Sequence, residues 1–176
     1  MCLAAPFDNA SVAAFIGALA GAVGTYIVVR ATDNARDRRK AKYVIPNMLD
    51  SAIEIAQQRL ESLGGRTTAP SGMVQISIGN PFNVAMLNQL AADASPFLTR
   101  PQSLALSKLV FYMTQADAIN EQLRLIWMQS REGHVANIQS VETYNQDQRS
   151  FLAQTEKLAD AYRNNKLTEK GLPAEQ

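Results

Sequence analysis

The chain has 176 residues, enough for one domain with a packed core and an appended segment. Its formal net charge is +1, so the chain as a whole lacks the basic excess that is typical of nucleic-acid-binding proteins. It has one cysteine, Cys2, and one histidine, His134. This composition excludes an intrachain disulfide, a cysteine zinc cluster and a Cys-x-x-Cys redox pair.

Charge is distributed unevenly along the chain. Residues 1–29 contain a single charged side chain, Asp8, whereas the next thirteen contain two acids and six bases. The bases are Arg30, Arg36, Arg38, Arg39, Lys40 and Lys42. The excess of positive charge is therefore local, and it directly follows the most apolar stretch.

That stretch, Ser11 to Val29, reads SVAAFIGALAGAVGTYIVV and has no charged residue. As a helix it would be about 28 Å long, close to the roughly 30 Å of a bilayer's hydrocarbon core. Basic residues at one end only predict that this end is cytoplasmic and that the N-terminus is outside. We expect a single-pass protein of the inner membrane, in contact with the lipid bilayer. Residues 1–29 would be the tail and transmembrane helix, and residues 30–44 a basic juxtamembrane helix.

Two other interpretations of this segment remain open. A cleaved signal peptide would need a basic residue in MCLAAPFDNA, which has none. The second alternative is that Ser11–Val29 is a helix buried in the core of a domain. The basic run is a topology determinant, a binding site for lipid headgroups or a nucleic-acid contact. Adjacency to the apolar stretch favours the headgroups over nucleic acid, and a topology determinant alone is the plainest interpretation. We expect no nucleic-acid partner.

The apolar stretch is rich in small residues, with Gly17 and Gly21 in a Gly-x-x-x-Gly pair. Such spacing lets two membrane helices approach closely, although Gly and Ala are also common in membrane helices generally. We predict a homo-oligomer or an association with other membrane-protein subunits. The expected packing surface consists of Ala14, Gly17, Ala18, Gly21, Ala22 and Gly24.

Residues 45–167 are predicted to form a cytoplasmic helical domain. Pro46 should kink or restart the helix, because it lacks a backbone donor. A helical stripe from Ile45 to Leu63 then ends at Gly64–Gly65. Residues 66–72 have the composition of a loop, and Met73–Ile78 alternates apolar and polar residues like a strand. A lone strand needs a partner chain, so we favour an extended connector.

Asn80–Pro81 predicts the start of a short helix ending near Ser95–Pro96. A long helix follows Thr99–Pro101, and a turn at residues 132–134 leads into the last helix. The long helix has its stripe at Ala105, Leu109, Tyr112, Ala116, Ile119, Leu123 and Ile126, widened by Leu106, Met113 and Trp127. The last helix has its seam at Ile138, Val141, Asn145, Gln148, Leu152, Thr155, Ala159 and Tyr162.

These elements predict an all-α fold: one transmembrane helix, then a three- or four-helix bundle with long antiparallel helices. Residues 168–176 should be a disordered tail. Asn145 and Gln148 interrupt the last seam, where they would either fix the register of the helices or face solvent. We expect Phe111, Tyr112 and Trp127 to belong to the core rather than to a ligand cage.

No reaction is recognisable in the sequence. It contains no Glu-x-x-His pair, no Gly-x-Ser-x-Gly elbow and no Walker A motif. We therefore expect no catalytic, cofactor-binding or metal-binding residues. The sequence predicts a non-enzymatic, membrane-anchored interaction or accessory subunit. The alternative is a membrane-bound sensor or regulator that binds a small ligand in the helical domain.

Overall fold

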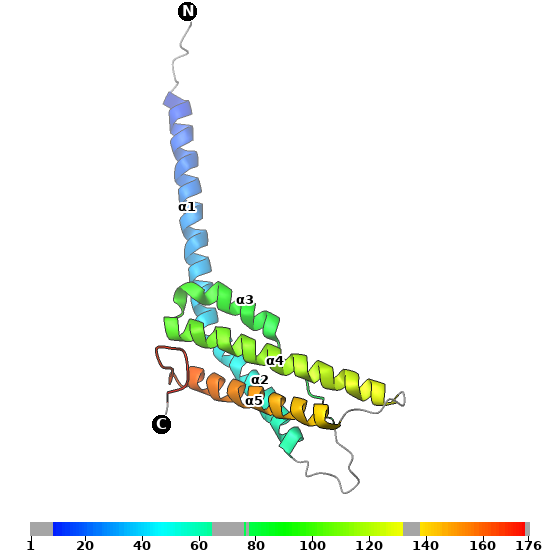
Figure 1. Cartoon of the computed structure of the whole chain (residues 1–176). Helices are drawn as coiled ribbons and strands as arrows, with labels where there is room; N and C mark the ends of the chain where they lie inside the picture. The colour runs from blue at the N-terminus through cyan, green and yellow to red at the C-terminus, as the bar shows by residue number, and fades with distance from the viewer. Residues whose placement is uncertain (1–8, 65–75, 77, 132–137, 175–176) are drawn as a thin grey trace, which may run out of the picture. The chain divides into compact units, whose positions relative to one another are not determined.

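The computed structural model describes residues 9–64, 76, 78–131 and 138–174, without the side chains of residues 9–17, 20, 64 and 138. The predicted all-α class is confirmed for this part of the chain, where every regular element is a helix (Figure 1). The chain divides into two compact units, residues 1–39 and residues 40–176, and each is described by itself.

The first unit contains helix α1, Asn9–Arg39. This single helix covers the predicted transmembrane stretch and continues through most of the basic run. Its described side chains are exposed, apart from a half-buried Asp37. No helix combines enough length with enough apolar character to cross a membrane, within the residues that the structure describes.

The second unit begins with a change of helix type. Residues Lys40–Val44 form the π-helix η1, and α2 follows as Ile45–Gly64. Pro46 has no N–H to offer the carbonyl of Lys42, so the α-helical hydrogen-bond pattern cannot run unbroken through this point. The predicted disruption at Pro46 therefore takes the form of one π-helical segment just before it. The predicted end of α2 at Gly64 is confirmed.

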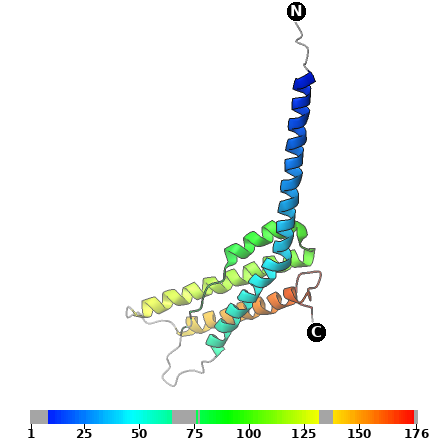
Figure 2. The same cartoon turned by 180° about the vertical axis from the view of Figure 1, so that it is seen from behind.

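The bundle of the second unit is built around α5, Ile138–Arg163, which packs against both α2 and α4, Arg100–Arg131. Helices α4 and α5 run antiparallel, as predicted (Figures 1 and 2). The shorter α3, Val84–Ala94, lies on α4 and also contacts η1 and α2. A short 3-10 helix, η2, Ser95–Phe97, joins α3 to α4.

The predicted apolar stripes form the core of this bundle. Leu49 and Ala56 of α2 are fully buried, as are Leu109 and Ala116 of α4. From α5, Leu152, Thr155 and Ala159 complete the core. Gln148, on the same seam, is 1% exposed, so the interpretation that it faces solvent is wrong.

Two helix starts show how local chemistry competes with tertiary contacts. Helix α4 begins as predicted: Thr99 Oγ1 accepts from the Gln102 N–H, and Gln102 Oε1 accepts from the Thr99 N–H, a reciprocal cap. Helix α3 starts at Val84 with Asn83 as its cap, three residues later than the predicted start at Asn80–Pro81. The prediction was wrong because side chains of α4 bind the backbone of residues 79–82.

The predicted connector and turns are described only in part. Ile76 and Ile78 of the strand-like segment lie outside helix and strand. Residues 66–72, 73–75 and 132–134 lie outside the described residues, so the loop and the turn stay predictions.

The predicted disordered tail differs from the structure. Residues 166–174 fold back on themselves, with Leu167 bridged to Pro173 and the Ala174 N–H donating to the Lys166 carbonyl. Gly171 closes the turn with φ +62°, a left-handed conformation that glycine adopts without strain. This closed segment, Lys166–Ala174, is called the C-terminal turn below.

Replacing Gly171 with alanine tests how firmly this turn is packed. A Cβ there would lie 2.7 Å from Leu104 Cβ and 2.7 Å from the Pro101 carbonyl oxygen, in addition to the unfavourable φ. We expect a loss of roughly 1–3 kcal/mol in the free energy of unfolding, measured by urea denaturation. Gly24→Ala is the control, because its Cβ would meet nothing within 4 Å. Equal stability of the two variants would contradict the packing of the turn.

Candidate functional site

The predicted packing surface on α1 is described in part. Ala14 and Gly17 lie outside the residues whose side chains are described. Ala18, Gly21, Ala22 and Gly24 are exposed, and a Cβ built at Gly21 or Gly24 meets nothing within 4 Å. Among the described residues, no contact requires glycine at these two positions.

The large apolar side chains of α1 surround the helix. Leu19, Val23, Tyr26 and the three residues Ile27–Val29 are between 50% and 65% exposed. At about 100° per residue, these positions point to all sides of the helix rather than to one face. A helix that is apolar all round is normally enclosed by protein or by lipid. No charged residue interrupts α1 before Arg30, whose guanidinium donates to the Tyr26 hydroxyl.

The predicted basic run is divided between the two units. Arg30, Arg36, Arg38 and Arg39 belong to the exposed surface of α1. Lys40 belongs to η1, where its Nζ lies 2.8 Å from Asp93 Oδ2 of α3. Lys42 lies over the ring of Tyr43, 5.2 Å from its centroid. Lys40 thus serves the packing of the bundle, a role that the sequence did not indicate.

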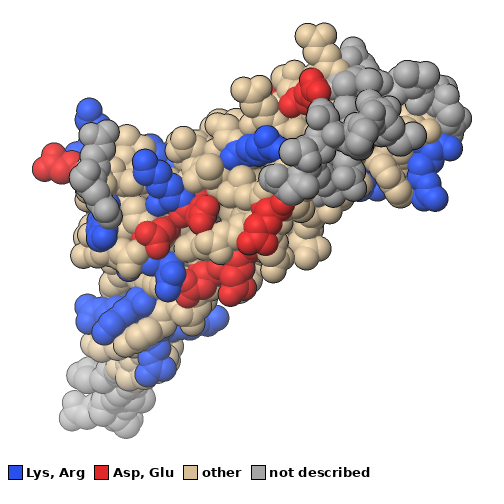
Figure 3. Space-filling model, turned by 90° about the horizontal axis from the view of Figure 1, so that it is seen from below, with Lys and Arg blue, Asp and Glu red and all other residues tan. Residues whose placement is uncertain are grey.

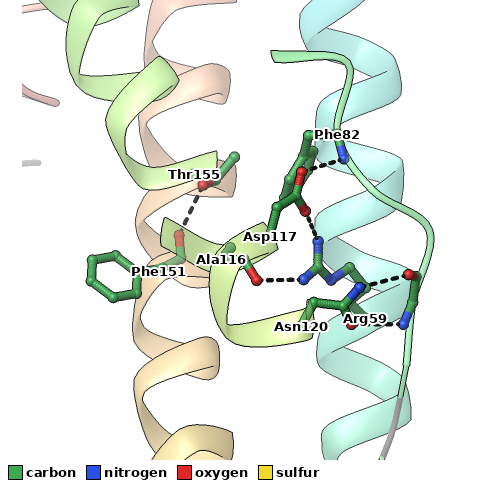
Figure 4. A network of polar contacts seen from close by, with 8 residues as sticks. Arg59, Phe82, Ala116, Asp117, Asn120, Phe151 and Thr155 are labelled. Atoms are coloured by element: carbon green, nitrogen blue, oxygen red, sulfur yellow. Dashed lines mark hydrogen bonds and ion pairs between the residues drawn. The ribbon is translucent and has the colours of Figure 1, made fainter. Parts of the chain in front are cut away.

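A buried polar network links α2, α4 and the segment before α3 (Figure 4). Its centre is Arg59, only 3% exposed on the packed face of α2. The guanidinium donates to Asp117 Oδ1 at 2.7 Å and to the Ala116 carbonyl at 2.8 Å. It also lies over the ring of Phe82, 5.1 Å from the centroid. A charge this deeply buried is stable only with an opposite charge and hydrogen bonds around it, and Asp117 supplies the charge.

The same network fixes the backbone of residues 79–82. Asp117 Oδ2 accepts from the Phe82 N–H at 2.9 Å. Asn120 accepts from the Gly79 N–H at 3.1 Å and donates to the Gly79 carbonyl at 3.0 Å. A Cβ at Gly79 would lie 2.4 Å from Arg59 Cγ, so only glycine lets the backbone pass this close. A segment without helix or strand is thereby held against α4.

Sequence reasoning missed this network, although one signal was present. Arg59 lies three residues after Ala56 and four before Leu63, so helical periodicity places it on the buried face of α2. A lone arginine on an apolar stripe predicts a buried acidic partner. Asn120 follows Ala116 on α4 by four residues and Asp117 follows it by one, but nothing local identifies Asp117 as that partner.

Burial dominates the protonation of Asp117. Desolvation raises the pKa of its carboxyl above the usual 3.8, and the opposing contributions of Arg59 and the Phe82 N–H are smaller. The ion pair therefore fixes geometry without contributing much net stability of its own.

Two further polar groups of α5 are buried without a partner among the described residues: Gln148 Oε1 and the Tyr162 hydroxyl. Burial raises the pKa of Tyr162 to about 12. Asn145 Oδ1, one turn before Gln148, is also without a partner in this part of the chain. The bundle therefore encloses these polar groups of α5. Burying a hydrogen-bonding group without a partner normally lowers the stability of the fold.

The aromatic cluster that forms contains Phe151 in place of the predicted Trp127. Phe111 and Tyr112 contact Phe151 of α5, with ring centroids 6.3 Å and 6.4 Å apart, and Phe111 is 53% exposed. Trp127 does not join them, because fifteen residues of helix place it more than 20 Å along α4 at ~1.5 Å per residue. It is 41% exposed and lies under the guanidinium of Arg131. The placement of Phe111 and Trp127 in the core was therefore wrong, whereas Tyr112 is partly buried against it.

Among the described residues, no group of three His, Cys, Asp or Glu side chains could hold a metal ion. Comparison with protein-family models, with curated proteins and with solved structures found no match. The candidate sites are therefore the exposed apolar surface of α1 and the Arg59 network.

The Arg59 network generates a prediction about pH. Because the folded chain holds the Asp117 proton more tightly than the unfolded chain, protonation stabilises the fold. This contribution is complete below pH 3.8 and is lost as pH rises through the raised folded-state pKa. Asp117→Asn removes the titration. The free energy of unfolding of the wild type relative to this variant should therefore decrease across that window, as measured by urea denaturation at a series of pH values.

A difference that grows with pH would show that attraction to Arg59, rather than burial, governs this carboxyl. Asp147→Asn, the same substitution at an exposed position of α5, is the matched control.

Proposed function

We propose that the protein is a non-enzymatic interaction subunit that α1 anchors to a membrane, with the helical bundle on the cytoplasmic side. The observation that carries the proposal is the apolar surface of α1 between Ala18 and Val29. Its large side chains are exposed on every side of the helix, without an intervening charge. In water this surface would be costly, at roughly 25 cal/mol per Å², whereas lipid or a partner helix would cover it.

The described part of α1 does not by itself meet the requirements of a membrane crossing. Ala18–Val29 is about 18 Å long at ~1.5 Å per residue, so a complete crossing would also need the residues from Ser11 onward. The bases that follow Val29 support an orientation with the bundle in the cytoplasm.

The small residues support assembly within the membrane. Gly21 and Gly24 have open space where a Cβ would be, so their small size serves no contact with the part of the chain that the structure describes. Close approach of a second helix, from another copy or from another subunit, would use that space. The bundle offers no recognised reaction centre in its described residues, and its network around Arg59 stabilises one arrangement of the helices.

A charge placed within the apolar surface tests the anchor. Val23→Asp introduces a carboxylate at a position that is 55% exposed, which is tolerated in water but costs about 2.5–3.5 kcal/mol inside a membrane helix. We expect the wild type to stay with the membrane fraction after alkaline extraction and to float with it in a density gradient. Val23→Asp should be released at least several-fold more readily.

Ala31→Asp is the matched control, since it adds the same charge at an exposed position beyond Arg30 and should be retained. Recovery of the wild type in the soluble fraction, with no difference between the two variants, would refute the anchor.

A larger side chain at Gly21 tests assembly through α1. A Cβ at Gly21 meets nothing within 4 Å among the described residues, and the position is exposed on a helix outside the bundle, so Gly21→Leu should leave the fold of the bundle unaffected. If Gly21 packs against a second helix, cross-linking between copies in native membranes should fall several-fold. Val23→Leu, on the opposite side of the helix, is the control. Unchanged cross-linking of both variants would mean that this face is not used by a second copy.

A further inference from the structure

The C-terminal turn is attached to the beginning of α4. Gly171 lies against Leu104, Pro101 and Ala105, at distances that leave no room for a side chain. Lys108 Nζ donates to the Lys170 carbonyl at 2.7 Å, which is a second contact between α4 and the turn. The turn and the first three turns of α4 thus form one continuous surface.

This surface carries apolar side chains that the bundle does not cover. Leu104 is 38% exposed, Leu172 is 39% exposed and Phe111 is 53% exposed. Leu104 and Phe111 are seven residues apart, so they lie on the same side of α4. Leu172 is next to Gly171, which touches Leu104. Leu104 and Leu172 are therefore exposed beside the turn, and Phe111 lies about 10 Å further along the same side of α4.

The same surface is basic. Residues 100–111 and 166–176 contain four bases, Arg100, Lys108, Lys166 and Lys170, against two acids, Glu169 and Glu175. Two acids lie at its margin: Asp50 is paired with Arg163 at 2.5 Å, and Asp160 accepts from Asn164 at 2.9 Å. Both are already engaged in contacts within the bundle.

Another part of the bundle has the opposite character. Helix α2 exposes Glu54 and Glu61, and its single base, Arg59, is buried. Figure 3 shows Asp and Glu side chains gathered across the middle of one face of the molecule.

We propose that the C-terminal turn and the adjoining start of α4 bind an anionic lipid surface. The ammonium and guanidinium groups of Arg100, Lys166 and Lys170 would contact headgroup phosphates. Leu104, Leu172 and Phe111 would enter the boundary between headgroups and acyl chains. Charge complementarity and the exposed apolar side chains support this occupant. The long stems of lysine and arginine can remain along the apolar boundary while their charged ends stay in water.

This inference deepens the proposed function, because it gives the bundle its own contact with the membrane to which α1 is proposed to attach. The two are separable. A contact through this surface depends on anionic lipid and is screened by salt, whereas insertion of α1 resists salt and alkali.

The test uses the full chain with Cys2 replaced by serine and a polarity-sensitive fluorophore attached at Leu172→Cys. The protein is mixed with vesicles of phosphatidylcholine alone or of phosphatidylcholine with phosphatidylserine. We expect a blue shift of the emission, and quenching by lipid-borne quenchers, at least several-fold stronger with phosphatidylserine. High salt should reverse the difference. Lys166→Glu together with Lys170→Glu should abolish it.

The control is the same fluorophore at Gln58→Cys, an exposed position on acidic α2, which should respond to neither kind of vesicle. An equal response at residues 172 and 58 would overturn the proposal. So would a response at residue 172 that is the same with and without phosphatidylserine, or the same before and after the charge reversal. A blue shift that needs no vesicles and grows with protein concentration would overturn it in favour of pairing with a second copy. Failure to survive alkaline extraction would refute the anchor alone, since the salt-sensitive response at residue 172 would persist.

Discussion

The guanidinium of Arg59 is the constraint on which the arrangement of the bundle depends. It is buried on the packed face of α2, where an unpaired cation would be very unfavourable. Asp117 and the Ala116 carbonyl accept from its two terminal nitrogens, whereas its Nε is buried without a partner among the described residues. These two bonds require α2 and α4 to pack together at this point along their lengths. Since Asp117 also binds the Phe82 N–H, the same interaction determines the path of the chain before α3. A purely apolar contact would have left that register less defined.

Around this point, α5 supplies most of the apolar packing. It lies against both α2 and α4 and brings Leu152, Leu158 and Ala159 into the core. Arg149 of α5 donates to the Leu63 carbonyl near the end of α2, where the last carbonyls of a helix have no partner within the helix. The helices are therefore connected by a few directional contacts within a mostly non-directional core.

The two units have surfaces of different character. The bundle hides its apolar stripes and carries charges of both signs, as expected of a domain in water. The described part of α1 before Arg30 exposes apolar side chains all round. Because of this contrast, we propose lipid or a partner helix as the surroundings of α1 and water as those of the bundle. The contrast also makes the apolar and basic surface at the C-terminal turn notable, because that surface belongs to the bundle but resembles an interfacial one.

The sequence by itself determined the helices and most of what they bury. Periodicity of 3.6 residues and the caps and breakers at Pro46, Gly64 and Thr99 act over a few residues, so they can be recognised locally. The tertiary structure decided which polar groups meet. Arg59 and Asp117 are 58 residues apart, and only the packing of α2 against α4 makes them partners. Likewise, the start of α3 and the closed C-terminal turn depend on side chains of α4 that are remote in sequence, since a backbone takes whichever hydrogen bonds the fold provides.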